Sequence, residues 1–437
     1  TQMNVYSSEL IPVKSQVSAP ETPEKPQAMQ VDFSMESQEP ALLMEDRGIT
    51  LSLDGLAATP EALSLLFTAR NALAEEVSLS TDWAMVNGFM MEPTGFASVP
   101  AGGSAMLVMD FPVPAGPVGA SLQQAGITEA REIRFRFALG FADGSLLRTD
   151  YTEDFHINTQ VPLGDMPPVQ ANPFEPVTLA SGDGISIELV GEPFMDGDYF
   201  HIPLKAINSS TEFDTISLAE SAVNGVMAPL IIPERLPPGA AMYTTASILL
   251  QKITLPPEYA EFQYLFDGMD NLESLGIAAP GEVTLRFAMS RESAGDRTPG
   301  LRFEPRAISL PGAEGENPPL DTTGVVLFDQ AGISITRLSS DPSGKKLYLH
   351  NSGPVAVKIS TFGRVAVDGV PYGSNVPIHS VISPGASAYA KLFDYLPGIE
   401  PEGKEISFHI NLVNLEENTL LFMSDKIALE LIGASEP

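Results

Sequence analysis

The feature that most constrains the fold of this chain is a set of five landmarks that occurs three times in the same order. Each unit opens with a glycine and an alternating β-branched run, passes through an alternating strand that ends at an asparagine, and reaches an Asn-Gly or Asp-Gly pair. A Pro/Gly turn and a last alternating strand follow. Repetition in constant order indicates one structural unit used three times in tandem.

The landmarks themselves indicate β-structure. Alternation with period 2 means that one face of a strand is buried while the other faces water. About seven short strands per unit, divided by turn residues, favour an all-β fold of three tandem immunoglobulin-like β-sandwiches. The opening runs are RGITLSL, DGISIEL and AGISITR, and the asparagines are Asn71, Asn208 and Asn351.

Proline-rich stretches mark the expected domain limits. We expect sandwiches at residues 39–162, 175–311 and 323–433, separated by semi-rigid spacers. Residues 1–38 read as an N-terminal extension and Pro-rich linker. Within it, the stretch from Tyr6 is similar to the last strand of the first unit, so it is either the last strand of a preceding repeat or a frayed terminus.

Composition limits the partners. The chain has 24 Lys+Arg against 56 Asp+Glu, a formal net charge of −32, and this field repels phosphate backbones. We therefore expect no nucleic-acid partner. No apolar run approaches the roughly 20 residues of a membrane span, so no membrane insertion is expected within this chain. The absence of cysteine excludes disulfides, thiolate metal sites and cysteine nucleophiles.

The stretch VNGFMM, residues 86–91, reads as a hairpin because Asn-Gly tolerates the positive φ angles of a two-residue type I′ turn. The apolar run after the turn breaks strict alternation. This pattern favours cover by a neighbouring domain; the alternative is an exposed patch for a partner, with Phe89, Met90, Met91 and Phe96 as our candidate partner-binding residues.

Trp83, the single tryptophan, is expected in the sandwich core, and stacking on a sugar is the alternative. Function concentrates on variable loops carried by rigid scaffolds, so we expect specialisation in Glu258–Gly276, a segment that reads as present only in the second unit.

Chemistry-bearing motifs are weak. GGSAM at Gly102 lacks the second glycine of a nucleophile elbow, and no two of the five histidines share a metal-ligand spacing. Asp267 and Asp270 could contribute to a Ca²⁺ site, but Leu272 stands where an EF-hand needs glycine, which favours a solvated turn. We expect no enzymatic activity, no catalytic residues, no metal and no cofactor.

The runs VNGFMM, SVPAGGSA, AGITEAREIRFRFALGF and DFHINT resemble an uncharacterised Ig-like repeat domain of surface or membrane-anchored proteins from Gram-positive, clostridia-type bacteria. The likeness is close in the first unit and looser in the second, and in the third unit Asp368 replaces the asparagine. The resemblance implies an extracellular or cell-surface protein of the bacterial envelope. It implies fold and location, not a mechanism. From the tandem architecture we predict binding or adhesion toward an unknown protein or glycan; the alternative is a structural stalk or sensor ectodomain.

Overall fold

The computed structural model describes residues 29–33, 39–116, 120–143, 146–164, 174–232, 235–257, 270–293, 296–297, 301–310, 320–341, 346–374, 377–391 and 404–430. The secondary structure in these ranges consists of strands and turns, without an α-helix. The predicted fold class, all-β with tandem β-sandwich domains, is confirmed.

The first sandwich has two sheets. One has the order β2 (Ala41–Asp46), β3 (Ile49–Ala58), β4 (Ala62–Asn71) and β8 (Ser104–Pro112). The other contains β1 (Met29–Asp32), β11 (Phe155–Pro162), β9 (Glu129–Asp143), β5 (Val77–Val86), β6 (Phe89–Met91), β7 (Phe96–Val99) and β10 (Leu146–Tyr151).

The second sandwich follows the same plan. Its first sheet contains β12 (Val177–Gly182), β13 (Ile185–Leu189), β14 (Phe194–Asp196), β15 (Tyr199–Asn208) and β19 (Ala241–Leu249). Its second sheet contains β16 (Asp214–Val223), β17 (Val226–Met227), β18 (Arg235–Leu236), β20 (Glu282–Ser293), β21 (Asp296–Arg297), β22 (Leu301–Arg302) and β23 (Arg306–Ser309).

The third sandwich again pairs two sheets. One contains β24 (Gly324–Gln330), β25 (Ile333–Leu338), β26 (Lys346–Asn351) and β30 (Ser387–Lys391). The other contains β27 (Val357–Val367), β28 (Val370–Ser374), β29 (Pro377–Ile382), β31 (Glu405–Asn414), β32 (Thr419–Met423) and β33 (Ile427–Glu430).

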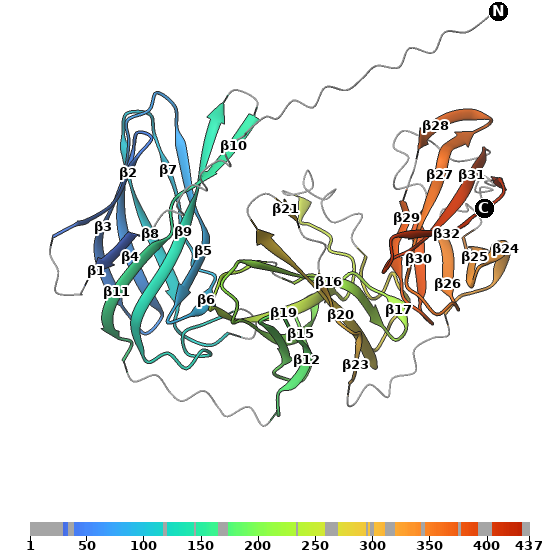
Figure 1. The fold of residues 1–437 in the computed structure, drawn as a ribbon, viewed down its shortest axis with the longest axis horizontal. Helices are drawn as coiled ribbons and strands as arrows, with labels where there is room; N and C mark the ends of the chain where they lie inside the picture. Colours follow the sequence, from blue (N-terminus) through green and yellow to red (C-terminus); the bar gives the residue numbers. More distant parts are fainter. Residues whose placement is uncertain are drawn as a thin grey trace, which may run out of the picture.

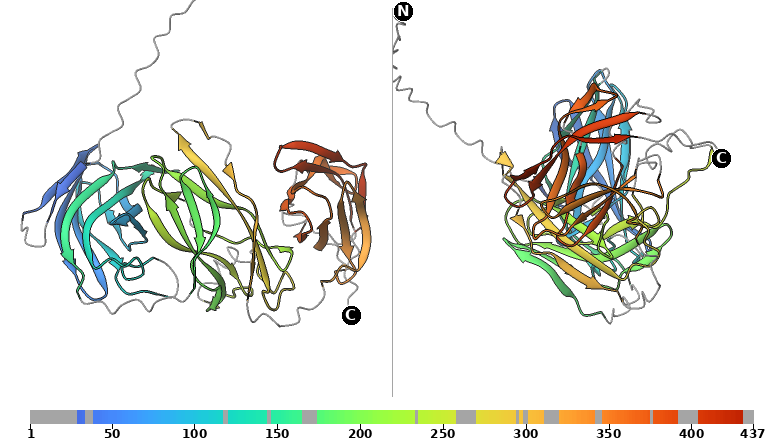
Figure 2. Two further views of the ribbon diagram at one scale, coloured as in Figure 1. Left: turned by 60° about the horizontal axis from the view of Figure 1, so that its bottom comes forward. Right: turned by 90° about the vertical axis from the view of Figure 1, so that its right-hand side faces the viewer.

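The path of the chain is immunoglobulin-like in each sandwich. In the first, β3 and β4 lie in one sheet, the chain crosses to β5 in the other, returns at β8 beside β4, and crosses back to β9 and β11. Buried side chains fall into three hydrophobic clusters, one centred on each sandwich. The sandwiches follow one another along the longest axis of the molecule (Figures 1 and 2).

The repeated asparagine closes each sandwich in the same way. The side-chain amide of buried Asn71 donates to the carbonyl oxygens of Glu75 and Val99 at 2.7 and 3.1 Å, and its oxygen accepts from the Leu73 N–H at 2.9 Å. A buried amide needs such partners, because an unsatisfied one costs about 1–3 kcal/mol. Asn208 and Asn351 make equivalent bonds.

One prediction about local structure is wrong, and another concerns residues that the structure does not describe. The sequence alone predicts helix-like structure in the segment LQQAGI near Leu122, but the segment forms turns, closed by a bond from the Ile127 N–H to the Leu122 carbonyl at 2.9 Å. The proposed orphan strand from Tyr6 lies outside the described residues. Among those described, the strand nearest the N-terminus is β1, which pairs in parallel with β11.

Candidate functional site

The second strand of the first Asn-Gly hairpin joins two domains. Strand β6 pairs antiparallel with β5 of its own sandwich, with Phe89 opposite Val86, and parallel with β19 of the second sandwich, with Phe89 opposite Ala241. The N–H of Ala241 donates to the carbonyl oxygen of Gly88 at 2.8 Å. A sheet of the first sandwich therefore continues into the second (Figure 1). We call this contact region the first joint.

The second Asn-Gly hairpin does the same one domain further on. Strand β17 pairs antiparallel with β16 and parallel with β30 of the third sandwich, with Val226 opposite Ser387. The N–H of Ser387 donates to the carbonyl oxygen of Gly225 at 2.8 Å. We call this the second joint. The repeated hairpin is thus a connector between domains as well as a turn.

The turn residues fix the direction of the hairpin. Asn87 and Gly88 have φ of 49° and 81°, the positive values that a type I′ turn requires. The Asn87 side chain accepts from the N–H groups of Arg131 and Glu132 at 2.8 and 3.1 Å and donates to the Glu129 carbonyl at 2.8 Å. Because these bonds tie the turn to the neighbouring strand, β6 projects toward the next domain in a fixed orientation.

The first joint is filled by aromatic and apolar side chains. Trp83 is 3% exposed and, with Met85 and Met90, belongs to the hydrophobic cluster of the second sandwich. Its ring centroid lies 5.8 Å from that of Phe213 in an edge-to-face arrangement. Trp83 is buried, as predicted, but at a different location: it lies between the first and second sandwiches and not inside the core of the first.

A stacked pair continues the joint beyond Trp83. The rings of Phe89 and Tyr243 are stacked, with centroids 6.1 Å apart. The Lys205 ammonium lies 5.9 Å from the first ring and 5.5 Å from the second, within the range of a cation–π contact. Each domain therefore contributes aromatic surface to the other.

Charged groups border these rings. Asp82 forms an ion pair with Arg136 of its own sandwich and another, at 3.3 Å, with Arg235 of the second. Burial raises the pKa of nearby Asp154 above its usual value, although the guanidinium of Arg136 opposes the shift. The joint is therefore held by opposite charges as well as by apolar packing.

The first joint also encloses a cavity of about 340 Å³, lined by Thr81, Asp82, Trp83, Arg235 and Tyr243 among others. The indole N–H of Trp83 is buried and makes no hydrogen bond. Buried donors are normally paired, so an unpaired indole N–H in this joint is unusual. This cavity is the strongest candidate for a small-molecule site.

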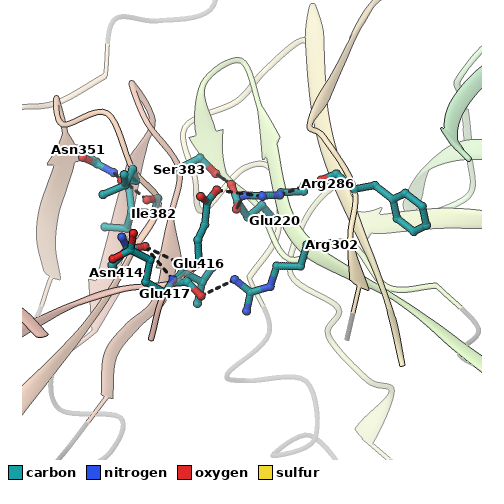
Figure 3. Close-up of polar contacts among 12 residues, drawn as sticks. Glu220, Arg286, Arg302, Asn351, Ile382, Ser383, Asn414, Glu416 and Glu417 are labelled. Carbon is teal, nitrogen blue, oxygen red and sulfur yellow. Dashed lines mark hydrogen bonds and ion pairs between the residues drawn. The ribbon is translucent and has the colours of Figure 1, made fainter. Parts of the chain in front are cut away.

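The second joint is polar where the first is aromatic. Glu220 occupies the position of Trp83 and pairs with Arg286 at 2.8 Å, and Arg286 also reaches Glu416 of the third sandwich at 3.0 Å (Figure 3). Ser383 donates to the Glu220 carboxylate across the joint. The guanidinium of Arg302 donates to the Leu415 carbonyl at 2.6 Å.

Arg286 stays charged in this partly buried place. Burial disfavours its charged form, but the hydrogen bonds that Arg286 donates to Glu220 and Glu416 outweigh burial and raise its pKa. A buried charge of this kind is tolerated only when it is paired. The triad of Glu220, Arg286 and Glu416 therefore stabilises the joint as a unit.

The four candidate partner-binding residues separate into two groups. Phe89 and Met90 lie in the first joint, and Met91 is buried in the core of the first sandwich. Phe96 is 69% exposed. Three of the four are therefore covered by the chain itself, and Phe96 alone among them is open to a partner.

The segment Glu258–Gly276 is described only from Asp270 onward, so Asp267 and the Ca²⁺ hypothesis lie outside the described residues. The described part is not peculiar to the second unit. Residues 271–277 form the same turn as residues 121–127, with the Ile277 N–H donating to Leu272 as that of Ile127 does to Leu122. The matching letters SLQQAGI and NLESLGI are a sixth repeated landmark that the sequence analysis overlooked.

The described part of the chain has neither a metal-binding cluster nor a membrane-spanning helix. It holds no group of three or more His, Cys, Asp or Glu side chains placed to bind a metal ion. It also holds no helix with the length and apolar character needed to cross a membrane.

These features define a class: tandem β-sandwich domains joined through strand pairing. No protein-family model and no curated protein matches the chain. Among solved structures, it is similar to a conserved domain protein from Bacillus anthracis, with 8% identity, 64% of this chain and 92% of that chain covered, and a TM-score of 0.20. It is also similar to the YadV chaperone, with 10% identity, coverage of 63% and 97%, and a TM-score of 0.18. With TM-scores this low, we take no function from either protein.

Proposed function

We propose that this protein is a non-enzymatic bacterial extracellular or cell-surface protein that acts as a stiff spacer, as a stalk or as the ectodomain of an envelope sensor. One observation carries the proposal: at both joints, a hairpin of one domain extends a sheet of the next. The surface location rests on the resemblance in the first unit, and the acidic composition suits a soluble, exposed protein.

The joints support stiffness for a physical reason. Relative motion of domains is the default unless their interface is large and hydrophobic. Here Trp83 and Met90 of the first sandwich are part of the core of the second, and Ala222 and Met227 of the second are part of the core of the third. Bending at either joint would have to break a backbone hydrogen bond and expose these side chains.

A distance measurement tests the spacer. The chain has no cysteine, so Glu61→Cys and Asp425→Cys, both at exposed positions, place one spin label on the first sandwich and one on the third. We expect one narrow distance distribution between the labels, and a broader one when Trp83→Ala is added. A broad distribution in the chain with intact joints would contradict the spacer role.

The cavity at the first joint supports a second candidate, binding of a small polar ligand such as a glycan fragment. The polar residues Thr81, Asp82 and Tyr243, which line the cavity beside the Trp83 ring, favour it. Trp83 is the single tryptophan, so its fluorescence reports this site alone. Titration with glycans and peptidoglycan fragments should shift the emission if a ligand enters, and Thr81→Val, which removes a hydroxyl from the cavity wall, should weaken that response. Unchanged emission with every fragment would leave the spacer as the supported function.

A further inference from the structure

The two joints show which features a domain needs in order to receive a hairpin. The first sandwich has these features, and no described residue of the chain occupies the place of the hairpin. At each joint, the receiving strand begins directly after a Pro/Gly turn whose glycine has positive φ, and its first residue donates to the incoming hairpin. Strand β8 of the first sandwich begins in the same way. The turn glycines are Gly102, Gly239 and Gly385, and the first residues of the strands are Ser104, Ala241 and Ser387.

The register confirms that these positions are equivalent. In all three sandwiches, the residue before that first residue accepts a hydrogen bond from the repeated asparagine, at 2.8 or 2.9 Å. In an antiparallel pair, the next N–H along the strand points away from its partner. The N–H of Ser104 therefore faces outward from the sheet, as those of Ala241 and Ser387 do toward their hairpins.

Strand β8 is an edge strand over this stretch. In the four-stranded sheet its only neighbour is β4, while Thr94 bridges to Asp110 near its far end. Met106, at the position of Tyr243 and Tyr389, is 71% exposed, whereas both tyrosines pack against the preceding domain. An exposed apolar edge strand is a ready template for pairing.

The candidate residue Phe96 borders the same edge. It follows Gly95, which lies against the carbonyl oxygen of Val108 in β8, and Val108 is itself exposed. The open edge therefore carries apolar side chains beside its free backbone groups.

The third sandwich carries the matching hairpin, but with a blocked strand. Val370 lies opposite Val367 across the Asp368-Gly369 turn, as Phe89 lies opposite Val86. Pro371 follows, at the position of Met90 and Met227. In a parallel pairing of this register, the residue at that position donates the next hydrogen bond to the receiving strand, and proline has no N–H. This hairpin therefore cannot complete the pairing made at the two joints.

We propose that the β8 edge, Ser104 to Val108, receives the Asn-Gly hairpin of a further β-sandwich repeat of this type, one whose hairpin keeps an N–H where this chain has Pro371. Assembly is then directional: this chain accepts a hairpin through its first sandwich and does not supply one through its third. The inference does not depend on the spacer function, since it concerns the open edge of the first sandwich and not the stiffness of the two joints.

The test restores, in the full chain, the backbone N–H that Pro371 lacks. Val370→Phe with Pro371→Met places Phe and Met after the turn glycine of the third sandwich, as at the first joint. We expect wild-type chain to sediment as a monomer and this double variant to form chains whose average size grows with concentration. Adding Ser104→Pro, which removes the outward N–H of β8, should return the double variant to monomer. Because a proline at the start of β8 could disturb folding, Met106→Glu at an exposed position provides a second block.

Two results would overturn the proposal. One is a double variant that remains a monomer at every concentration at which the wild type does. The other is association that persists with Ser104→Pro and with Met106→Glu. Wild-type self-association that both blocks abolish would identify a second copy as the occupant and would refute the role of Pro371.

Discussion

The two joints use one backbone connection with two different sets of side chains. At both, a hairpin strand pairs in parallel with the next sandwich through a 2.8 Å hydrogen bond to the turn glycine. Yet the first joint places Trp83 where the second places Glu220, and it uses ring stacking where the second uses a charged triad. The comparison indicates that the strand pairing defines the joint, and that the side chains around it are free to diverge.

The largest expected effect on stability is at the first joint, where the packing is aromatic. Trp83→Ala should reduce the free energy of unfolding by about 3–5 kcal/mol, the range for deleting a buried large aromatic side chain. Urea denaturation measures it, with Phe96→Ala as the control, because exposed Phe96 should give a change near zero. A loss equally small for both variants would mean that Trp83 is not part of a packed core.

At the polar joint, Glu220→Ala should cost about 2–3 kcal/mol, since it leaves Arg286 partly buried with one acid instead of two. The exposed partner offers a matched comparison. Glu416→Ala should cost less than Glu220→Ala in the same denaturation experiment, because Glu416 lies in solvent and Glu220 does not. The reverse order would show that the triad is centred on Glu416.

If strand pairing defines both joints, one backbone change should affect them alike. Met90→Pro and Met227→Pro each remove the N–H that faces the next domain, and each should cost about 1–2 kcal/mol beyond the loss of the side chain. Met90→Leu and Met227→Leu are the side-chain controls. Protection of the joint amides in hydrogen exchange provides the measurement. A loss at one joint only would show that strand pairing does not define both joints.

The smallest effect is a pH dependence inside the second sandwich. Burial lowers the pKa of His201 below the usual 6.5, and its Nδ1 lies 2.7 Å from the Ser247 hydroxyl. The unfolded chain then binds more protons than the folded chain, so stability rises with pH through this window and falls as pH drops below about 6.5. Melting temperatures at pH 7.5 and 5.5 should differ less in His201→Gln than in wild type. An unchanged difference would assign the effect to other groups.

Much of the fold was predictable because it is encoded locally. Asn-Gly pairs between alternating strands predict hairpins, and the structure gives Asn87 and Asn224 the expected positive φ. The joints were not predictable in the same way. Pairing of Phe89 with Ala241 depends on two distant segments meeting in space, so the apolar run after the turn favours cover by a neighbouring domain but does not identify the strand that provides it. The turn at Leu122 read as helix-like because a single turn has too few residues to show a period.

Because Trp83 and Met90 complete the core of the second sandwich, the stability of that domain depends in part on the first sandwich. In a linear array, the stability of each unit is the sum of its own term and its nearest-neighbour terms. The second sandwich gains such a term at each of the two joints. Unfolding of either neighbour should therefore lower the stability of the second sandwich.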